Sequence, residues 1–433
     1  MTTYARRLGL FSGTMAVVGG IIGGGIFRTP ATVAERLASP GMVLIAWVMG
    51  GVVALIGAFC WGELGQRRPR AGGGYVYLRE TFGSLPAFLY GWTLVLVIAT
   101  GAIAAVAVTF ADYTLALLGL PQRLSVPLAV AAIVLLSGIN YVGVRPAAIT
   151  QNIFTILKLL ALATLIGVGL VAGGPSPPSA APAQPQHFAA IGPALVPILF
   201  TYGGWQQTNF IAEEIVDPER NLPRALVFGV VIVVTVYLLT NLTYLRVLGH
   251  EGLAASTAPA ADTMQAVLGP VGGKLIAAGI AISTFGFLNL VILVTPRVLQ
   301  AMAADGVFFR RLADLHPVYR TPTLAIVSLA VCAIVLTLSG TFGQLVDYVT
   351  FGDWIFFGMT AAGLFVYRSR EQGPAPGAPS FRVPGYPYTV GLFVLAAGLV
   401  VFSAIASNPR NAAIGAGLIA LGIPAFLYWR RRG

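Results

Sequence analysis

Charge is scarce in this chain of 433 residues, since 9% of them are charged and 57% are hydrophobic. Such a composition cannot be distributed over the surface of a soluble protein, which excludes the soluble classes. Histidine and cysteine are also scarce. His187, His250 and His316 all fall in expected loops, which excludes an intramembrane haem or di-histidine metal site, and Cys60 and Cys332 lie inside apolar runs. We therefore expect no metal, no cofactor, no enzyme activity and no disulfide-linked partner subunit.

Long apolar runs, separated by short polar or proline-rich loops, make up nearly the whole chain. Runs of about 20 residues or more cross a bilayer as helices and are too long for barrel strands. The sequence therefore predicts an all-α integral membrane protein with twelve transmembrane helices, of which the third and eighth are long and tilted. The expected spans are residues 10–34, 41–66, 83–118, 125–143, 150–173, 191–216, 224–246, 268–302, 322–339, 344–367, 388–406 and 411–429.

Positive charge is distributed unevenly among the expected loops. If the N-terminus is inside, most arginines fall in inner loops, and the outer loops receive mainly Arg36, Arg123, Arg246 and Arg410. Because loops rich in Lys and Arg stay in the cytoplasm, both termini are expected there, in a multi-pass protein of the plasma (inner) membrane in contact with lipid. The net charge of +11 follows from this asymmetry, and a nucleic-acid partner has no support.

Two glycine clusters interrupt apolar runs at matching places, Gly23-Gly24-Gly25 in the first span and Gly203-Gly204 in the sixth. In hydrocarbon, unwound backbone is tolerated only where it lines a cavity or binds something. Paired broken helices in the two halves of a chain are typical of a transporter and its substrate site. Small residues also serve helix packing, which is the alternative for any single glycine.

The number of crossings between the two breaks is odd, so the second half enters the membrane from the opposite face. This pattern predicts an inverted repeat of five spans plus five, with broken helices 1 and 6 and two extra helices. The expected units are residues 1–173 (first repeat), 174–190 (extracellular loop), 191–367 (second repeat), 368–387 (cytoplasmic loop) and 388–433 (two helices and a short cytoplasmic tail).

Helix ends at mid-membrane carry partial charge. A helix that restarts near Gly25 presents free N–H groups, which suit a carboxylate, and an inward-running half-helix that ends near Gly204 presents carbonyl oxygens, which suit an ammonium group. A small molecule with both groups a few ångströms apart is an α-amino acid. The expected substrate-binding residues are Ile21, Ile22, Gly23, Gly24, Gly25, Ile26, Phe200, Thr201, Gly203 and Gly204.

Lys158 is a lone cation in the apolar run from Phe154 to Leu160. Such a residue costs about 3 kcal/mol on insertion scales and is a functional hypothesis by default. The alternative is that its side chain extends to the interface, but its expected depth of about 12 Å from residue 150 is near the limit of that reach. A buried lysine could also load and release a proton.

Several ordered motifs resemble the amino acid-polyamine-organocation (APC) superfamily and, within it, the L-amino acid transporter-like permeases. They are Gly23-Gly24-Gly25-Ile26-Phe27 with Thr29-Pro30, the segment from Pro69 to Leu78, the segments from Phe200 to Trp205 and from Glu213 to Arg224, and the segment from Pro296 to Gly306. The resemblance implies the inverted-repeat fold, amino-acid substrates and Phe200 as an aromatic gate. The family has a serine where this chain has Gly24, so a hydroxyl near the substrate carboxylate is missing.

The resemblance also implies a coupling role for Lys158. In the similar permeases, a lysine on span 5 replaces the sodium ion of sodium-coupled relatives by bridging spans 1 and 8. Carried over, its ammonium group approaches the carbonyls from Gly19 to Ile22 and the hydroxyl of Ser283. Sodium dependence is then not expected.

Other polar residues have weaker patterns. Glu213 and Glu214 are interpreted as interfacial ion pairs or gate elements with Arg220 and Arg224. Gln206, Asn209 and Asn289 either line the pocket or bind neighbouring helices, with the second interpretation favoured, and Trp205 is interpreted as a packing residue. Asp112, Asp347 and Asp353 fall within predicted spans, with Asp353 the deepest.

These observations predict a secondary transporter of L-amino acids that works by alternating access, as a sodium-independent exchanger or by proton-coupled uptake. Neutral amino acids are preferred because no unpaired acid is evident at the expected pocket. Two alternatives stay open. A cationic amino-acid or polyamine carrier would have Asp353 facing the cavity, and a membrane sensor or scaffold would keep the fold without transporting.

Overall fold

The computed structural model describes residues 3–172, 190–340, 342–371 and 380–431, with side chains from 341 to 351 outside the description. Within these ranges the chain is helical, and its one β-type contact is an isolated parallel bridge between Leu8 and Ile215. The expectation of an all-α chain is confirmed. The expected outer loop, residues 174–190, lies almost wholly outside the described residues, and so does much of the inner loop, residues 368–387.

Between residues 3 and 172, the structure contains eight α-helices and three short 3₁₀ or π segments. They are α1 (Leu10–Ile21), η1 (Gly25–Phe27), α2 (Thr29–Arg36), α3 (Pro40–Arg67), α4 (Gly74–Phe82), α5 (Ser84–Thr93), the π-helical η2 (Leu94–Ala99), α6 (Thr100–Leu118), η3 (Gln122–Leu124), α7 (Ser125–Val142) and α8 (Val144–Ala172).

The described part of the second half contains α9 (Ile191–Thr201), η5 (Trp205–Glu214), α10 (Pro218–Ala255), α11 (Pro259–Leu268), α12 (Pro270–Ala304), η6 (Arg310–Ala313), α13 (Thr323–Ser339), α14 (Phe342–Ser369), α15 (Tyr388–Ser407), α16 (Pro409–Ala420) and α17 (Gly422–Arg430).

Eight helical segments in the described ranges are long and apolar enough to cross a membrane, and α1 and α13 are shorter apolar helices. The boundaries of the observed helices differ from those of the expected spans where polar residues continue a helix beyond its apolar part. The helix α8 begins at Val144 instead of residue 150, and α10 extends from Pro218 to Ala255, through a kink at Gly249, instead of covering 224–246. Short polar helices such as α4 and α11 have no counterpart among the expected spans.

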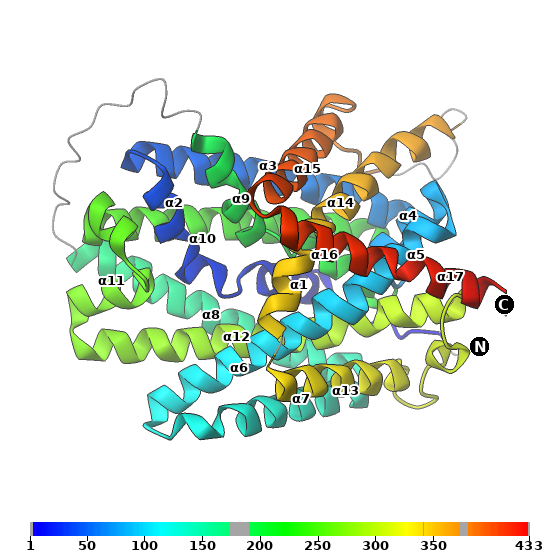
Figure 1. Cartoon of the computed structure of the whole chain (residues 1–433), viewed down its shortest axis with the longest axis horizontal. Helices are drawn as coiled ribbons and strands as arrows, with labels where there is room; N and C mark the ends of the chain where they lie inside the picture. The colour runs from blue at the N-terminus through cyan, green and yellow to red at the C-terminus, as the bar shows by residue number, and fades with distance from the viewer. Residues whose placement is uncertain (1–2, 173–189, 341, 372–379, 432–433) are drawn as a thin grey trace.

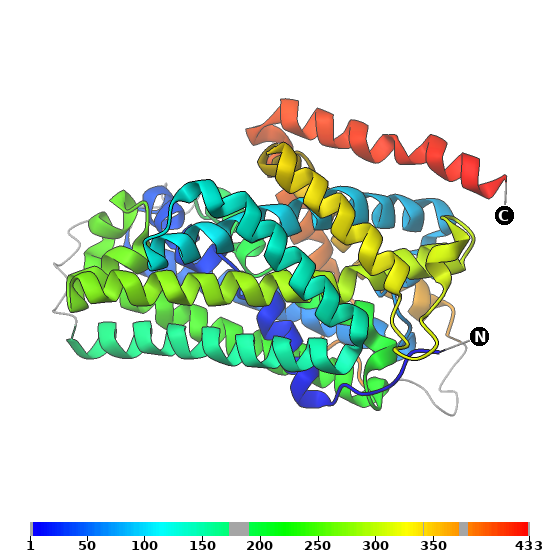
Figure 2. The same cartoon turned by 90° about the horizontal axis from the view of Figure 1, so that it is seen from below.

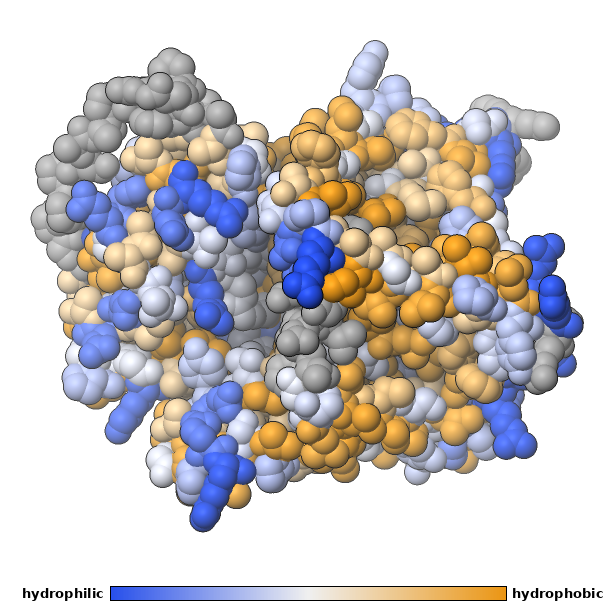
Figure 3. Space-filling model, viewed as in Figure 1, coloured by the Kyte–Doolittle hydropathy of each residue, from blue (hydrophilic) through white to orange (hydrophobic). Residues whose placement is uncertain are grey.

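The long helices run side by side along the molecule (Figure 1). The helix α10 packs against α1 and α3, and α12 packs against α6 and α8. Both termini lie at the same end of the molecule, and α16 and α17 lie on the outside of the bundle (Figure 2). Hydrophobic residues cover much of the right half of the face in Figure 3, and hydrophilic residues gather at its right-hand edge, close to both termini. An apolar exterior of this kind suits contact with lipid.

The segment from Gly72 to Gly74 is packed against Phe210. The N–H of Gly72 donates to the carbonyl of Phe210 at 3.0 Å, and a Cβ on Gly73, whose φ is +47°, would lie 2.8 Å from Phe210. The helix α4 that follows binds the end of α12, because the Tyr75 hydroxyl donates to Asp305 Oδ2 at 2.8 Å. Burial and the neighbouring Asp305 carboxylate raise the pKa of Tyr75, so the phenol keeps its proton and donates this bond.

Candidate functional site

The first interruption lies between α1 and η1. The helix α1 ends at Ile21, the chain turns through Gly23 and Gly24, and a single 3₁₀ turn begins at Gly25 and leads into α2. Among the described residues, the structure records no hydrogen-bond partner for the backbone N–H groups of Gly24, Gly25 and Ile26. Three adjacent donors are therefore free at the start of the outer half-helix, where the positive end of the helix dipole adds to them.

The second interruption lies between α9 and η5. The helix α9 ends at Thr201, and Gly204 adopts φ +119°, a conformation that an L-residue rarely takes. The described residues include no donor to the carbonyl oxygens of Tyr202 and Gly203. Two acceptors are therefore free at the end of a half-helix, whose dipole is negative there.

The two interruptions touch each other. A Cβ on Gly204 would lie 2.2 Å from the carbonyl oxygen of Gly20, and a Cβ on Gly20 would lie 2.9 Å from the carbonyl oxygen of Gly204. The Tyr237 hydroxyl of α10 donates to the Ile21 carbonyl at 3.1 Å and lies 3.5 Å from the Thr201 carbonyl. Glycine at both positions allows this approach of two backbones, and Tyr237 holds both helix ends.

A cavity of about 310 Å³ opens beside this contact. Its size is at the lower end of the range for small-molecule sites. Of the expected binding residues, eight line it, namely Ile21, Gly23, Gly24, Gly25, Phe200, Thr201, Gly203 and Gly204. Phe200 is 52% exposed, although it is a large aromatic side chain within a membrane-length region, so its ring faces the open space.

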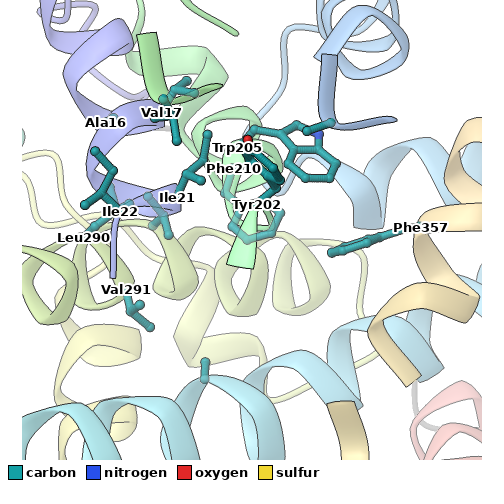
Figure 4. Packing of buried hydrophobic residues seen from close by; sticks show 14 of the residues in the cluster. Ala16, Val17, Ile21, Ile22, Tyr202, Trp205, Phe210, Leu290, Val291 and Phe357 are labelled. Carbon is teal, nitrogen blue, oxygen red and sulfur yellow. The ribbon is translucent and has the colours of Figure 1, made fainter. Parts of the chain in front are cut away.

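Two expected residues, Ile22 and Ile26, do not line the cavity. Both are fully buried. The Ile22 carbonyl accepts from Lys158, and the Ile26 carbonyl accepts from Tyr244 of α10 at 3.4 Å. These residues therefore support the interruption from behind. Figure 4 shows Ile21 and Ile22 at the end of α1, near Leu290 and Val291 of α12, with Tyr202, Trp205 and Phe210 beyond them.

Lys158 lies behind the first interruption instead of in the cavity. It is 14 residues after the start of α8, or about 21 Å along the helix. Its Nζ donates to the carbonyls of Ile22 at 2.7 Å and Gly19 at 3.2 Å. The Ser283 hydroxyl of α12 binds the same Ile22 carbonyl at 3.3 Å, so Lys158 and Ser283 meet at one oxygen.

The polar residues that sequence patterns left ambiguous now divide into two groups. Gln206 lines the cavity, and its Oε1 accepts from the Gly204 N–H at 3.0 Å. Asn209 donates to the Trp61 carbonyl, and Asn289 donates to Ala147 and Gln151 of α8. Trp205 packs among aromatic rings, with Trp61 at 6.3 Å between centroids. The favoured interpretation, that these side chains bind neighbouring helices, is thus correct for Asn209 and Asn289 but not for Gln206.

The expected pairing of Glu213 and Glu214 with Arg220 and Arg224 is wrong for Glu214. Its carboxylate binds Arg297 of α12 at 2.9 Å, and both side chains are buried. Span 6 turns back against α12 at this point, which brings together residues 83 positions apart. Sequence spacing along one helix end cannot reveal such a pair.

The three acids in predicted spans also separate. Asp112 accepts from Ser125 at 2.5 Å, at the junction of α6 and α7, and the side chain of Asp347 lies outside the described residues. Asp353 of α14 lines the cavity. No group of three His, Cys, Asp or Glu side chains suited to a metal occurs in the described part of the chain.

Much of the cavity wall was not anticipated, because its residues are ordinary apolar ones. From α12, the wall includes Thr284, Phe287, Val291 and Thr295, which follow one another at helical spacings of three and four. From η2 and α6 come Leu94, Ile98, Ala99, Ala102, Ala105 and Val106, and from α14 come Trp354 and Phe357. The α12 spacing was readable in the sequence, but buried packing stripes have the same period.

An all-helical apolar chain whose two interrupted helices meet beside a substrate-sized cavity has the architecture of a multi-pass membrane transporter. The model of the amino acid permease family matches residues 8–428, and the chain belongs to this family, within the APC superfamily. The resemblance inferred from the motifs is thereby confirmed.

Characterised relatives cover nearly the whole chain. The large neutral amino acids transporter small subunit 2 of Mus musculus is 33% identical over 99% of this chain and 82% of its own length. The b(0,+)-type amino acid transporter 1 of Homo sapiens is 33% identical over 92% of this chain and 84% of its own length. The Asc-type amino acid transporter 1 of Homo sapiens is 34% identical over 99% of this chain and 83% of its own length.

Proposed function

We propose that this protein is a secondary transporter that moves L-amino acids across the plasma membrane by alternating access, with the substrate held between the two helix interruptions. The observation that carries the proposal is the contact of Gly20 with Gly204, which places free N–H donors and free carbonyl acceptors beside one cavity. The relatives, each named as an amino acid transporter, support the same substrate class.

The α-amino and α-carboxylate groups would be recognised by backbone alone. The carboxylate accepts hydrogen bonds from the N–H groups of Gly24 and Gly25, and the ammonium group donates to the carbonyl of Gly203, all three of which line the cavity. Because backbone groups read only the part common to all α-amino acids, the cavity walls decide the side chain. Phe200 stands at the open side, where its ring can cover a bound substrate.

The membrane topology belongs to the same proposal. We infer twelve spans, with residues 1–173 and 191–367 as inverted repeats, residues 388–433 as two added helices, and both termini in the cytoplasm. The location of both termini at one end of the molecule and the arginine-rich inner loops support it. Two repeats of opposite orientation let one scaffold open alternately to either side.

Lys158 would act as a fixed cation in place of a transported sodium ion. Its ammonium group satisfies the carbonyls of Gly19 and Ile22, which a sodium ion would otherwise coordinate, so transport requires no sodium gradient. Proton coupling through Lys158 is the alternative to plain exchange.

We also propose that the chain works without a disulfide-linked second subunit. The mouse relative's name calls that protein a small subunit. Here, however, Cys60 is buried, and Cys332 is exposed in the middle of the apolar helix α13, where lipid and not a partner's thiol surrounds it. A single band of unchanged mobility on non-reducing gels of membranes is expected.

The test is uptake by proteoliposomes that contain the purified protein. Vesicles preloaded with unlabelled amino acid should exchange it for labelled L-amino acid, with equal rates in sodium and choline buffers. Repeating the assay with and without a pH gradient separates exchange from proton coupling. If the protein neither transports nor binds any α-amino acid, while retaining its fold, the proposal is wrong and the sensor alternative stands.

The apolar walls fit neutral side chains, and neutral amino acids remain expected substrates. The expected preference for neutral substrates assumed that no unpaired acid lies at the pocket, and that premise is wrong because Asp353 lines the cavity. The range of accepted side chains is therefore wider than composition alone indicates.

A further inference from the structure

An acidic side chain that has no hydrogen bond or ion pair with the described residues lies in the cavity wall. Asp353 is the twelfth of the 28 residues of α14, about 17 Å along the helix, and is half-buried between the buried residues Gly352 and Trp354. Among the described residues, the structure records no hydrogen bond and no ion pair for it. In contrast, the buried acids Glu63 and Glu214 both bind arginines.

The charge of Asp353 is not balanced by the rest of the described cavity wall. None of the other described lining residues is charged, and the ammonium group of Lys158 binds the carbonyls of Gly19 and Ile22 behind α1. An ionised carboxylate held in a membrane without a counter-charge is costly, and such residues mark binding or transport sites. A cationic group on a substrate that enters the cavity would supply the missing positive charge.

The cavity wall between the helix interruptions and Asp353 suits the apolar alkyl chain of a substrate's side chain. Phe287 and Val291 of α12 and Phe357 of α14 line the same cavity as Gly24, Gly203 and Asp353. Phe357 lies four residues after Asp353, on the same face of α14, and its ring points toward Phe210 and Trp205 (Figure 4). An alkyl chain fixed at the interruptions by its α-amino acid group can thus extend along aromatic walls to a carboxylate.

We infer that Asp353 determines specificity by pairing with a cationic group at the end of the substrate's side chain, so that the carrier prefers L-amino acids such as lysine, ornithine or arginine over neutral amino acids of the same length. The inference rests on the proposed function, because it uses the head-group site at the two interruptions. It assigns to the α14 side of the cavity a role in binding the substrate's side chain, which is separate from the binding of the α-amino acid group at the interruptions.

The experiment compares matched pairs of substrates in wild type and variants. Lysine and norleucine share an alkyl stem, as do arginine and citrulline, and the members of each pair differ mainly in the terminal charge. Each is tested as a competitor of labelled leucine uptake and as a ligand that raises the melting temperature of the purified protein. The variants are Asp353→Asn, which is isosteric and uncharged, and Asp353→Glu. Asp112→Asn is the control, because Asp112 binds Ser125 outside the cavity lining.

Wild type and Asp112→Asn should bind lysine about ten- to a hundredfold more tightly than norleucine, the usual effect of one desolvated charge-assisted hydrogen bond. Asp353→Asn should lose that preference while its affinity for norleucine stays within about threefold, and Asp353→Glu should restore part of it. The melting-temperature shift with lysine, but not with norleucine, should disappear in Asp353→Asn.

Two results would overturn the inference and leave the proposed function intact. One is that the ratio of the affinity for lysine to the affinity for norleucine is the same in wild type and Asp353→Asn, while both proteins exchange neutral amino acids. The other is an unchanged ratio together with loss of the response to a pH gradient, which would make Asp353 a proton site. If no amino acid binds to or is exchanged by wild type, the proposed function itself fails.

Discussion

At the scale of single residues, Lys158 is the most informative, because the chain has only one other lysine, Lys274, and that one is exposed. Replacing Lys158 by Ala leaves the Gly19 carbonyl without its lysine donor and the Ile22 carbonyl with only the Ser283 hydroxyl, and it removes the cation that we propose takes the place of a coupling ion. We expect uptake to fall at least about tenfold, while the loss of stability stays within the roughly 1–3 kcal/mol of unsatisfied buried acceptors. Uptake by proteoliposomes and size-exclusion profiles measure the two effects.

Lys274→Ala is the control for Lys158→Ala, since it removes the same charge at an exposed position and should leave uptake unchanged. Lys158→Arg should restore little, because the site is buried and one ammonium nitrogen contacts both carbonyls, a geometry that a larger planar guanidinium group does not reproduce. Normal uptake by Lys158→Ala would show that the buried ammonium group only supports the fold.

A second residue-scale prediction concerns Gly24, where the similar permeases have serine. Gly24 has φ −81° and ψ −17°, which any L-residue adopts, and a Cβ there would meet nothing within 4 Å. Gly24→Ser should therefore fold normally and add a hydroxyl beside the free N–H groups. We expect about a fivefold gain in affinity for amino acids, equal to one hydrogen bond of about 1 kcal/mol.

The measurement for Gly24→Ser is the concentration of leucine that half-saturates exchange. Gly24→Ala is the control that adds the carbon without the hydroxyl, and it should leave the affinity near that of wild type. A Gly24→Ser protein that folds but binds leucine more weakly would contradict a carboxylate at this position.

Residues differ in how far the sequence reveals them. Lys158 could be identified because a single cation in an apolar run has few explanations. Asp353 could be placed in a span but not in the cavity, because the direction of its side chain depends on how α14 packs. Arg297 was hidden for the same reason, since only the fold brings it to Glu214.

At the scale of elements, the junction of α9 and η5 depends on Gly204. Its φ of +119° and its contact with the Gly20 carbonyl both exclude a side chain. Gly204→Ala should separate the two interrupted helices, lower the melting temperature by several degrees and abolish detectable amino-acid binding. Thermal unfolding in detergent, with and without leucine, tests both effects.

Gly119→Ala is the matched control at this scale. Gly119 also has positive φ, +66°, but a Cβ there would meet nothing within 4 Å. The substitution therefore imposes backbone strain of about 1 kcal/mol without a clash and should leave binding intact. If both variants behave alike, strain alone explains the effect, and the contact between the interruptions contributes nothing.

Most elements were predictable because membrane spans follow from long apolar runs. The two interruptions were also predictable, since three consecutive glycines in the first span are matched by a glycine pair in the sixth, whereas the pair Gly50-Gly51 lies within the helix α3. The short helices α4 and α11, and the π-helical turn η2 that lines the cavity, were not, because tertiary packing sets them. The early start of α8 was not predicted, because polar residues continue the helix beyond the apolar run from which the span was predicted.

At the scale of the whole molecule, one buried ion pair joins three parts of the chain at the end where the termini lie. Arg297 of α12 binds Glu214 of η5, and its guanidinium carbon lies 5.9 Å from the ring of Tyr4. The backbone of Glu214 in turn accepts from the N–H groups of Arg7 and Leu8. A carrier that alternates has to separate contacts of this kind to open that end, so their strength affects the balance between its two states.

The prediction for this pair is a double-mutant cycle. Glu214→Leu or Arg297→Met alone should destabilise the protein by about 3–5 kcal/mol, since each leaves a buried charge without a partner. The double substitution Glu214→Leu with Arg297→Met should recover most of that loss, because apolar groups of similar volume replace the pair. The exposed pair of Arg68 and Glu80, with the Arg68 side chain 46% exposed, is the control and should contribute less than about 1 kcal/mol. Additive losses at Glu214 and Arg297 would mean that the two side chains do not act as a pair, and then the closure of this end would have to come from the other contacts of the N-terminal segment.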